Sequence, residues 1–276
     1  TQLCRGMTPR FSARLWLGMI PVWQLSQDTL ASPWGQFSGL WQVAAVWGIA
    51  VSLEIYATGE LSGAHLNPAI TVAFAVFRGF PARKIAAYVV AQVTGAIAAA
   101  ATLYAIFCHA IGSFEAAHHL VRGGQGSELS AMIYGEYFPN PSVLGVSAEA
   151  WSSVPLLQAM LAEGLGTALL AFFVFAVTEP RNSSHPGGAL AALLIGLALS
   201  IIISVFAPLT QAGFNPARDF GPRLFSYLAG WGSVAIPGPR GGFFTVYILA
   251  PIVGAGAGGA VHQGLIRAGL PCRDRC

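Results

Sequence analysis

The sequence predicts an all-α membrane protein with six transmembrane helices and two re-entrant half-helices, arranged as an inverted repeat. Three observations lead to this fold class. First, 55% of the 276 residues are hydrophobic and only 9% are charged, whereas an ordinary soluble domain carries about 25% charged residues. This excludes a soluble enzyme, a nucleic-acid binder and a disordered protein. Second, the chain contains a series of continuous apolar runs. Third, one tripeptide occurs twice, about half a chain apart.

Five apolar runs have about the length of 20 residues that a helix needs to cross the roughly 30 Å of hydrocarbon in a bilayer. The runs are continuous and do not alternate between apolar and polar residues, so they indicate helices rather than strands of a membrane barrel. They cover residues 40–58, 84–111, 154–178, 187–206 and 243–266.

The sequence before residue 40 is a poorer match to a spanning helix. Residues 11–25 are apolar on average but include Arg14, Pro21 and Gln24. We expect a damaged, partial or unusual first helix here. Our hypothesis is that residues 1–30 are replaced sequence, arising from a truncation or a frameshift.

Two further apolar segments, residues 68–77 and 216–228, are only about half a span long. Each follows a Gly-containing stretch without helical periodicity, and each begins within the tripeptide Asn-Pro-Ala. The two copies lie 148 residues apart and consist of Asn67, Pro68, Ala69 and Asn215, Pro216, Ala217.

This repeat predicts how the chain is organised. Three spans in each half, an odd number, require the second half to enter the membrane from the opposite side, so that the two short helices approach each other. We therefore expect one channel domain over residues 1–276. Its inverted repeats cover approximately 11–111 and 154–268, and an outer loop, 112–153, joins them.

The tripeptide has a direct physical interpretation. Asn is a good N-cap, Pro is favoured at the first helical position, and the helix N-terminus carries about half a positive charge. Two such ends meeting at mid-membrane repel cations, while the two Asn amides donate to a solute oxygen and interrupt a proton wire. A single copy would cap any helix, but two copies that each begin a half-span indicate a transport pathway.

The stretches before each Asn cannot be helical throughout, so their carbonyls must line a wet passage. We expect two ladders of acceptors facing an apolar wall, a combination that suits polyols or water rather than ions. The carbonyls belong to Gly63, Ala64, His65, Gln211, Ala212 and Gly213. The His65 ring is either a pH-sensitive gate or a packed group that holds the loop, and we favour the packed ring.

Basic residues predict the orientation. Ten of the fourteen fall on one side, which places both termini in the cytoplasm if the first helix crosses. These ten are Arg5, Arg10, Arg14, Arg78, Arg83, Lys84, Arg181, Arg267, Arg273 and Arg275.

From about Trp34 to Cys272, the chain resembles the major intrinsic protein family, the aquaporins and glycerol facilitators. The resemblance rests on the segments around the two tripeptides, residues 62–71 and 213–223, and on residues 118–123, 137–141 and 228–232. Asp219, directly after Asn-Pro-Ala-Arg, and Arg223, four residues further on, are similar to the bacterial glycerol-facilitator branch, in which this acidic residue accompanies a wider pore.

The resemblance implies roles for individual residues and an assembly. Arg218 corresponds to the filter arginine that donates to two solute hydroxyls, and Trp47 to the aromatic filter residue. Ile203 and Ala212 fall at the other two filter positions. Glu163 corresponds to a buried acid that accepts from loop N–H groups. The family also implies a homotetramer with one pore per subunit.

Three departures from the family pattern stand out. The glycerol branch usually has Gly and an aromatic residue where this chain has Ile203 and Ala212, so we expect one aromatic wall and looser selectivity. The first helix lacks the family's buried Glu. Glu54 lies within a predicted span, seven residues after Trp47. It is either a vestibule ligand or gate, or a helix acid that substitutes for the missing Glu, and we favour the latter.

The sequence thus predicts a passive channel for small uncharged polyols, with glycerol as the leading candidate and some water permeation. The alternatives are a water, urea or metalloid-hydroxide pore, or a non-conducting member of the family if the first helix is defective. We expect a multi-pass protein of the plasma or inner membrane, without enzymatic activity, cofactor, metal or nucleic-acid partner. The tail pair Cys272 and Cys276 is read as free thiols.

Overall fold

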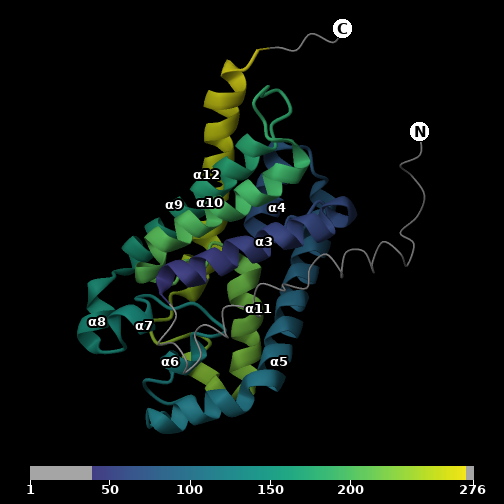
Figure 1. Ribbon diagram of the computed structural model, residues 1–276. Coiled ribbons are helices and arrows are strands. Elements are labelled where there is room, and N and C mark those ends of the chain that lie inside the picture. The colour runs from purple at the N-terminus through teal and green to yellow at the C-terminus, as the bar shows by residue number, and fades with distance from the viewer. Residues whose placement is uncertain (1–38, 272–276) are drawn as a thin grey trace.

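The computed structural model describes residues 39–271 of the protein. Its regular elements are helices (Figure 1). Five of them are long and apolar enough to cross a membrane. Four of them are α3 (Leu40–Ser62), α5 (Ile85–Ala117), α9 (Leu156–Val177) and α10 (Gly187–Thr210). The fifth, called the last helix below, is continuous and consists of η5 (Phe244–Leu249), α12 (Ala250–Val261) and η6 (His262–Arg267).

The five predicted spans are therefore confirmed, and α5 extends six residues beyond the apolar run because its last turns continue into the outer connection. The expected first helix, residues 11–25, and the tail cysteines lie outside the described residues. Large apolar side chains such as Leu53, Leu161 and Ile201 are exposed on the outside of the bundle, as expected for surfaces that face lipid.

The two half-helices are α4 (Pro68–Phe77) and α11 (Pro216–Ser226). α11 ends two residues before the predicted boundary. The chain then makes a wider turn, η3 (Tyr227–Trp231), in which Gly230 takes a φ of 108°. That backbone conformation lies in a region that Gly adopts without steric cost.

The long helices pack in pairs: α3 along α10, and α9 along α12, while α4 contacts α12 and α11 contacts α5 (Figure 1). The α3–α10 crossing depends on Gly48 and Gly196. A Cβ atom at Gly48 would lie 2.2 Å from the Gly196 carbonyl oxygen, and a Cβ atom at Gly196 would lie 2.1 Å from the Gly48 carbonyl oxygen. These two residues are 148 apart, as are the Asn-Pro-Ala copies. The sequence repeat is therefore also a repeat of packing.

The segment between α5 and α9 contains three short helices, α6 (Glu128–Ala131), α7 (Pro141–Leu144) and α8 (Ala148–Ser153). They lie at the end of the molecule opposite the C-terminal end of the last helix (Figure 1). At that other end, the ends of α4, α9 and the last helix meet, because Glu179 forms ion pairs with Arg78 at 3.4 Å and Arg267 at 3.6 Å.

Candidate functional site

The two loops that precede the half-helices have the same unusual backbone. Non-Gly residues with positive φ occur at equivalent positions of both: Ala64 (44°) and Leu66 (55°) in one, Ala212 (65°) and Phe214 (50°) in the other. Left-handed conformations cost an L-residue about 1–2 kcal/mol each. Contacts from the surrounding helices must therefore hold these residues in place. In this conformation the loop carbonyls do not take part in helical hydrogen bonds.

The two Asn side chains join the loops. The Oδ1 atom of each caps its own half-helix, Asn67 accepting from the Ala69 N–H and Asn215 from the Ala217 N–H. The Nδ2 atom of Asn67 donates to the Phe214 carbonyl at 2.8 Å, and that of Asn215 donates to the Leu66 carbonyl at 2.8 Å. The N-termini of α4 and α11 are therefore held together, with the second N–H of each amide making no hydrogen bond within residues 39–271.

Glu163 of α9 holds the second loop from behind. Its Oε1 accepts from the Gly213 N–H at 2.9 Å and from the Thr210 hydroxyl at 2.6 Å, and its Oε2 accepts from the Phe214 N–H at 2.7 Å. The side chain is fully buried. These contacts satisfy the N–H groups of Gly213 and Phe214 and hold the loop against α9.

His65 holds the first loop through its ring. Its Nδ1 lies 3.2 Å from the Thr71 hydroxyl, and the ring packs against Phe74, Phe80 and Tyr88 with centroids 4.7–4.9 Å apart. Tyr88 also donates to the Ser62 carbonyl. These contacts show a packed ring that holds the loop.

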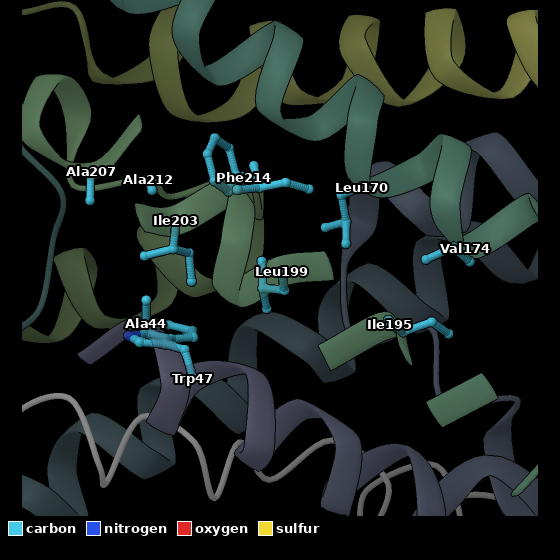
Figure 2. Close-up of a cluster of buried hydrophobic side chains, with 11 residues drawn as sticks. Ala44, Trp47, Leu170, Val174, Ile195, Leu199, Ile203, Ala207, Ala212 and Phe214 are labelled. Atoms are coloured by element: carbon cyan, nitrogen blue, oxygen red, sulfur yellow. The ribbon is translucent and has the colours of Figure 1, made fainter. Parts of the chain in front are cut away.

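The four residues at the expected filter positions lie together. Trp47, Ile203 and Ala212 belong to one buried apolar cluster, in which Trp47 of α3 faces Ile203 of α10 and Ala212 lies beyond it (Figure 2). The guanidinium carbon of Arg218 is 4.9 Å from the centre of the Trp47 ring, within the range of a cation–π contact. This group of residues thus combines an aromatic, an aliphatic and a cationic side chain.

Three of these four residues, Trp47, Ile203 and Ala212, line a cavity of about 220 Å³ together with the two Asn residues. This volume is well above the roughly 10–15 Å³ that a single water needs. The cavity lining includes residues 63–67 and 212–215 of the two loops, and apolar residues of α3, α4, α9 and α10. Along α10 the lining runs from Gly188 to Ile203, a rise of about 22 Å at 1.5 Å per residue. The cavity therefore extends over much of a membrane's thickness.

Two of the predicted site residues, Gln211 and Glu54, are not among the residues that line the cavity described above. The Gln211 side chain accepts from the Tyr137 N–H and donates to the Met132 carbonyl, so it anchors the outer connection. Glu54 is buried on α3, but the cavity wall is formed there by Trp47 and Val51.

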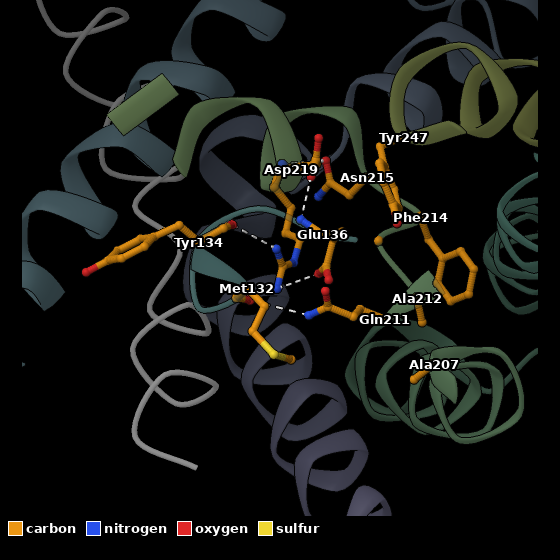
Figure 3. Close-up of polar contacts among 12 residues, drawn as sticks. Met132, Tyr134, Glu136, Ala207, Gln211, Ala212, Phe214, Asn215, Asp219 and Tyr247 are labelled. Atoms are coloured by element: carbon orange, nitrogen blue, oxygen red, sulfur yellow. Dashed lines mark hydrogen bonds and ion pairs between the residues drawn. The ribbon is translucent and has the colours of Figure 1, made fainter. Parts of the chain in front are cut away.

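The outer connection supplies a charged residue that the sequence reasoning did not find. An Oε1 atom of Glu136 lies 2.6 Å from the Nη2 of Arg218, and both side chains are 1% exposed. Arg218 also donates to the Tyr134 carbonyl at 3.2 Å. Figure 3 shows Glu136 between the loop residue Gln211 and the α11 residues Asn215 and Asp219. No local motif marks Glu136, which lies in an irregular segment 82 residues before Arg218.

Asp219 and Arg223, one turn apart on α11, hold the same connection through its backbone. Their ion pair measures 2.8 Å, and both side chains are buried. Asp219 accepts from the Glu136 N–H at 2.8 Å, and Arg223 donates to the carbonyls of Glu136 and Ala235. The pair therefore fixes the segment that borders the filter.

Within residues 39–271, no group of three His, Cys, Asp or Glu side chains is placed to hold a metal ion. Spanning helices, two half-helices that meet at their N-termini and a long cavity beside them define a membrane channel. The chain belongs to the major intrinsic protein family, whose sequence profile matches residues 19–262. Members of this family are passive channels, so the protein is a channel and not an enzyme.

Named relatives support this assignment. The chain is 43% identical over 238 residues to a glycerol uptake facilitator protein of Pseudomonas aeruginosa, with 86% of this chain and 81% of the relative covered. It is 42% identical over 239 residues to a propanediol uptake facilitator of Citrobacter freundii, covering 86% and 84%. The glycerol uptake facilitator protein of Escherichia coli K12 is 41% identical over 243 residues, covering 88% and 82%.

The fold is also similar to that of a solved structure, the aquaglyceroporin from Plasmodium falciparum. The TM-score is 0.77, the sequence identity is 22%, and the match covers 93% of this chain and 96% of the other. The predicted all-α fold with an inverted repeat is thereby confirmed.

Proposed function

We propose that the protein conducts small uncharged polyols, with glycerol as its main solute and some water, through the cavity between α3, α10 and the two loops. The observation that carries the proposal is the two-sided wall of this cavity. Loop carbonyls and the Asn67 and Asn215 amides offer hydrogen bonds on one side, and apolar side chains cover the other. A polyol presents hydroxyls along one edge and a carbon backbone along the other, which matches both walls.

In this proposal the filter is formed by Trp47, Ile203, Ala212 and Arg218. Arg218 donates to solute hydroxyls, and the Trp47 ring lies against the alkyl backbone. The positive N-terminal ends of α4 and α11 and the Arg218 charge disfavour cations. Ions therefore lose their hydration without gaining a compensating site.

A propanediol is the second candidate. The relatives named for glycerol and for propanediol are similarly close in sequence. Ile203 places an aliphatic side chain at the filter, where a methyl group is better accommodated than a third hydroxyl. A filter with Ile203 and Ala212 also favours the alternative of water or urea as the main solute.

Stopped-flow swelling of proteoliposomes with water, glycerol, 1,2-propanediol and urea tests these candidates together. We expect polyol entry well above that of protein-free liposomes, and the ratio of glycerol to propanediol rates decides between the first two. Water permeation with polyol rates equal to the protein-free background would contradict the polyol proposal.

We also propose an inner-membrane protein with both termini in the cytoplasm and a homotetrameric assembly. Arg78, Arg181 and Arg267 lie at the same end of the bundle, joined through Glu179 and through the bond from Arg181 to the Leu270 carbonyl, which supports a cytoplasmic location of that end. Tag accessibility in intact cells tests the orientation, and native mass spectrometry tests the tetramer.

A further inference from the structure

The Glu136 side chain has one polar contact within residues 39–271, the ion pair with Arg218. Its backbone, by contrast, is held at both polar groups, the N–H by Asp219 and the carbonyl by Arg223. The loop is therefore fixed without the carboxyl group. What the carboxyl group adds is a negative charge on the outer edge of the filter arginine.

A buried ion pair is weak ground for a stabilising role, because desolvation of both charges offsets much of their attraction. The burial of this ion pair does support an electrostatic role of Glu136. Both side chains are 1% exposed, so water screens their interaction little, and a change in the charge of Glu136 is felt fully by Arg218.

We propose that Glu136 sets the strength of the filter arginine: its carboxylate weakens the hold of Arg218 on a passing solute and so lets the solute leave the filter quickly. The inference rests on the proposed role of Arg218 as the solute-binding group of the filter. Glu136 acts through Arg218 and lies behind it, so it is a positioning and charge-setting residue that need not touch the solute.

Conduction sets two limits on a binding site in a pore. The site must be favourable enough for a solute to enter and weak enough for it to leave. A guanidinium without a neighbouring carboxylate is a stronger donor to a hydroxyl oxygen. Hydrogen bonds to charged groups are roughly twice as strong as neutral ones, so neutralising Glu136 shifts the site toward tight binding.

Other charged and titratable groups surround Glu136 on all the elements packed against it. Two of them are arginines and three are carboxyl groups, so the charge of Glu136 adds to a layer that already holds both signs. They are Arg218, Asp219 and Arg223 of α11, Glu163 of α9, Tyr247 of η5, Tyr137 of the same loop and Glu128 of α6.

The test compares Glu136→Gln with the wild type in proteoliposomes at pH 9, by measuring glycerol influx over a range of concentrations. Gln keeps the shape and the acceptor oxygen but removes the charge. We expect both the half-saturating glycerol concentration and the maximal influx to fall by about fivefold. Glu136→Asp, which keeps the charge, should shift both values toward those of the wild type.

Glu115→Gln is the matched control, because Glu115 forms an ion pair of 2.7 Å with Arg122 in the outer region but does not line the cavity. We expect wild-type values for it. Wild-type values in Glu136→Gln would overturn the inference. A higher half-saturating concentration in Glu136→Gln would also overturn the inference. It would mean that the substitution displaces Arg218 and that Glu136 has a purely structural role.

The inference and the proposed function fail in different ways. If wild-type vesicles exclude polyols but pass water, the polyol proposal falls. Water passes the same arginine, and a lower osmotic water permeability in Glu136→Gln then still supports the inference, whereas an unchanged one overturns it. A wild type that passes neither contradicts both.

Discussion

Asn67 and Asn215 each hold the loop of the other repeat, with two hydrogen bonds of 2.8 Å from their amide nitrogens to the carbonyls of Phe214 and Leu66. The reciprocity has a structural reason. The two residues are equivalent in a repeat of 148 residues, and the α3–α10 crossing at Gly48 and Gly196 follows the same spacing. The contact between the half-helices is therefore a property of the symmetric fold.

Replacing Asn215 with Asp should separate capping from donation. Asp is as good an N-cap as Asn, so α11 should form, but the bond to the Leu66 carbonyl loses its donor and a negative charge enters between the two helix ends. We expect glycerol influx to fall at least about tenfold, which corresponds to about 1.4 kcal/mol, and a cation leak to appear in a vesicle assay with a potential-sensitive dye.

Asn140→Asp is the control for that substitution. Asn140 is another Asn before a Pro that caps a helix and donates to a carbonyl, that of Ala207, but it does not line the cavity. Equal effects of the two substitutions on the cation leak would contradict a pore role for Asn215.

Glu163→Gln should loosen the second loop. The Glu163 carboxylate accepts three hydrogen bonds, whereas an amide turns an NH₂ group toward one of those donors. An unsatisfied buried donor costs about 1–3 kcal/mol. We expect a lower unfolding temperature in detergent and reduced glycerol influx, with no change in Glu149→Gln, because Glu149 is exposed on α8. Wild-type stability would show that the loop does not depend on this acid.

Glu179→Ala should destabilise the end of the bundle that we assign to the cytoplasm. Glu179 is fully buried between Arg78 and Arg267, and these arginines are 20% and 39% exposed. Removing the carboxylate leaves two cations facing each other, which costs about 2 kcal/mol after allowance for solvent screening. Thermal unfolding in detergent checks this, with the exposed Glu60→Ala as control. An unchanged unfolding temperature in Glu179→Ala would mean that the cluster adds nothing.

The Glu136–Arg218 pair predicts a pH dependence. Glu136 lies in the outer connection, outside the spanning helices, and burial raises its pKa to about 8 although Arg218 favours the charged form. The carboxyl group is thus mainly protonated at pH 6 and mainly ionised at pH 9. We expect wild type and Glu136→Gln to have similar half-saturating glycerol concentrations at pH 6 and to diverge at pH 9. A wild-type value that is constant from pH 6 to pH 9 would contradict the titration.

Much of the fold was predictable because it depends on local signals. Continuous apolar runs mark the spans, and Asn-Pro-Ala marks a capped half-helix wherever it occurs. The filter positions came from the family resemblance, and Trp47, Ile203, Ala212 and Arg218 lie together in the structure.

The outer connection was not predictable in the same way. Glu136 reaches Arg218 only because Asp219 and Arg223 fix the backbone of an irregular segment, and such long-range contacts leave no periodic pattern. Gln211 was expected to offer a pore carbonyl because of its place in the loop. Its side chain also bonds to the backbone of Tyr137 and Met132, partners that are distant in sequence and that no local pattern marks.

The central claim is that solutes pass between α3 and α10 at the filter, and blocking Ile203→Cys with a thiol reagent tests it most directly. Ile203 lines the cavity, whereas Ile201 on the same helix is 59% exposed on the outside. A methanethiosulfonate reagent should reduce glycerol influx of Ile203→Cys to the protein-free background, and a reducing agent should restore it. Wild type and Ile201→Cys should keep their flux. Full glycerol influx through labelled Ile203→Cys would contradict the pathway.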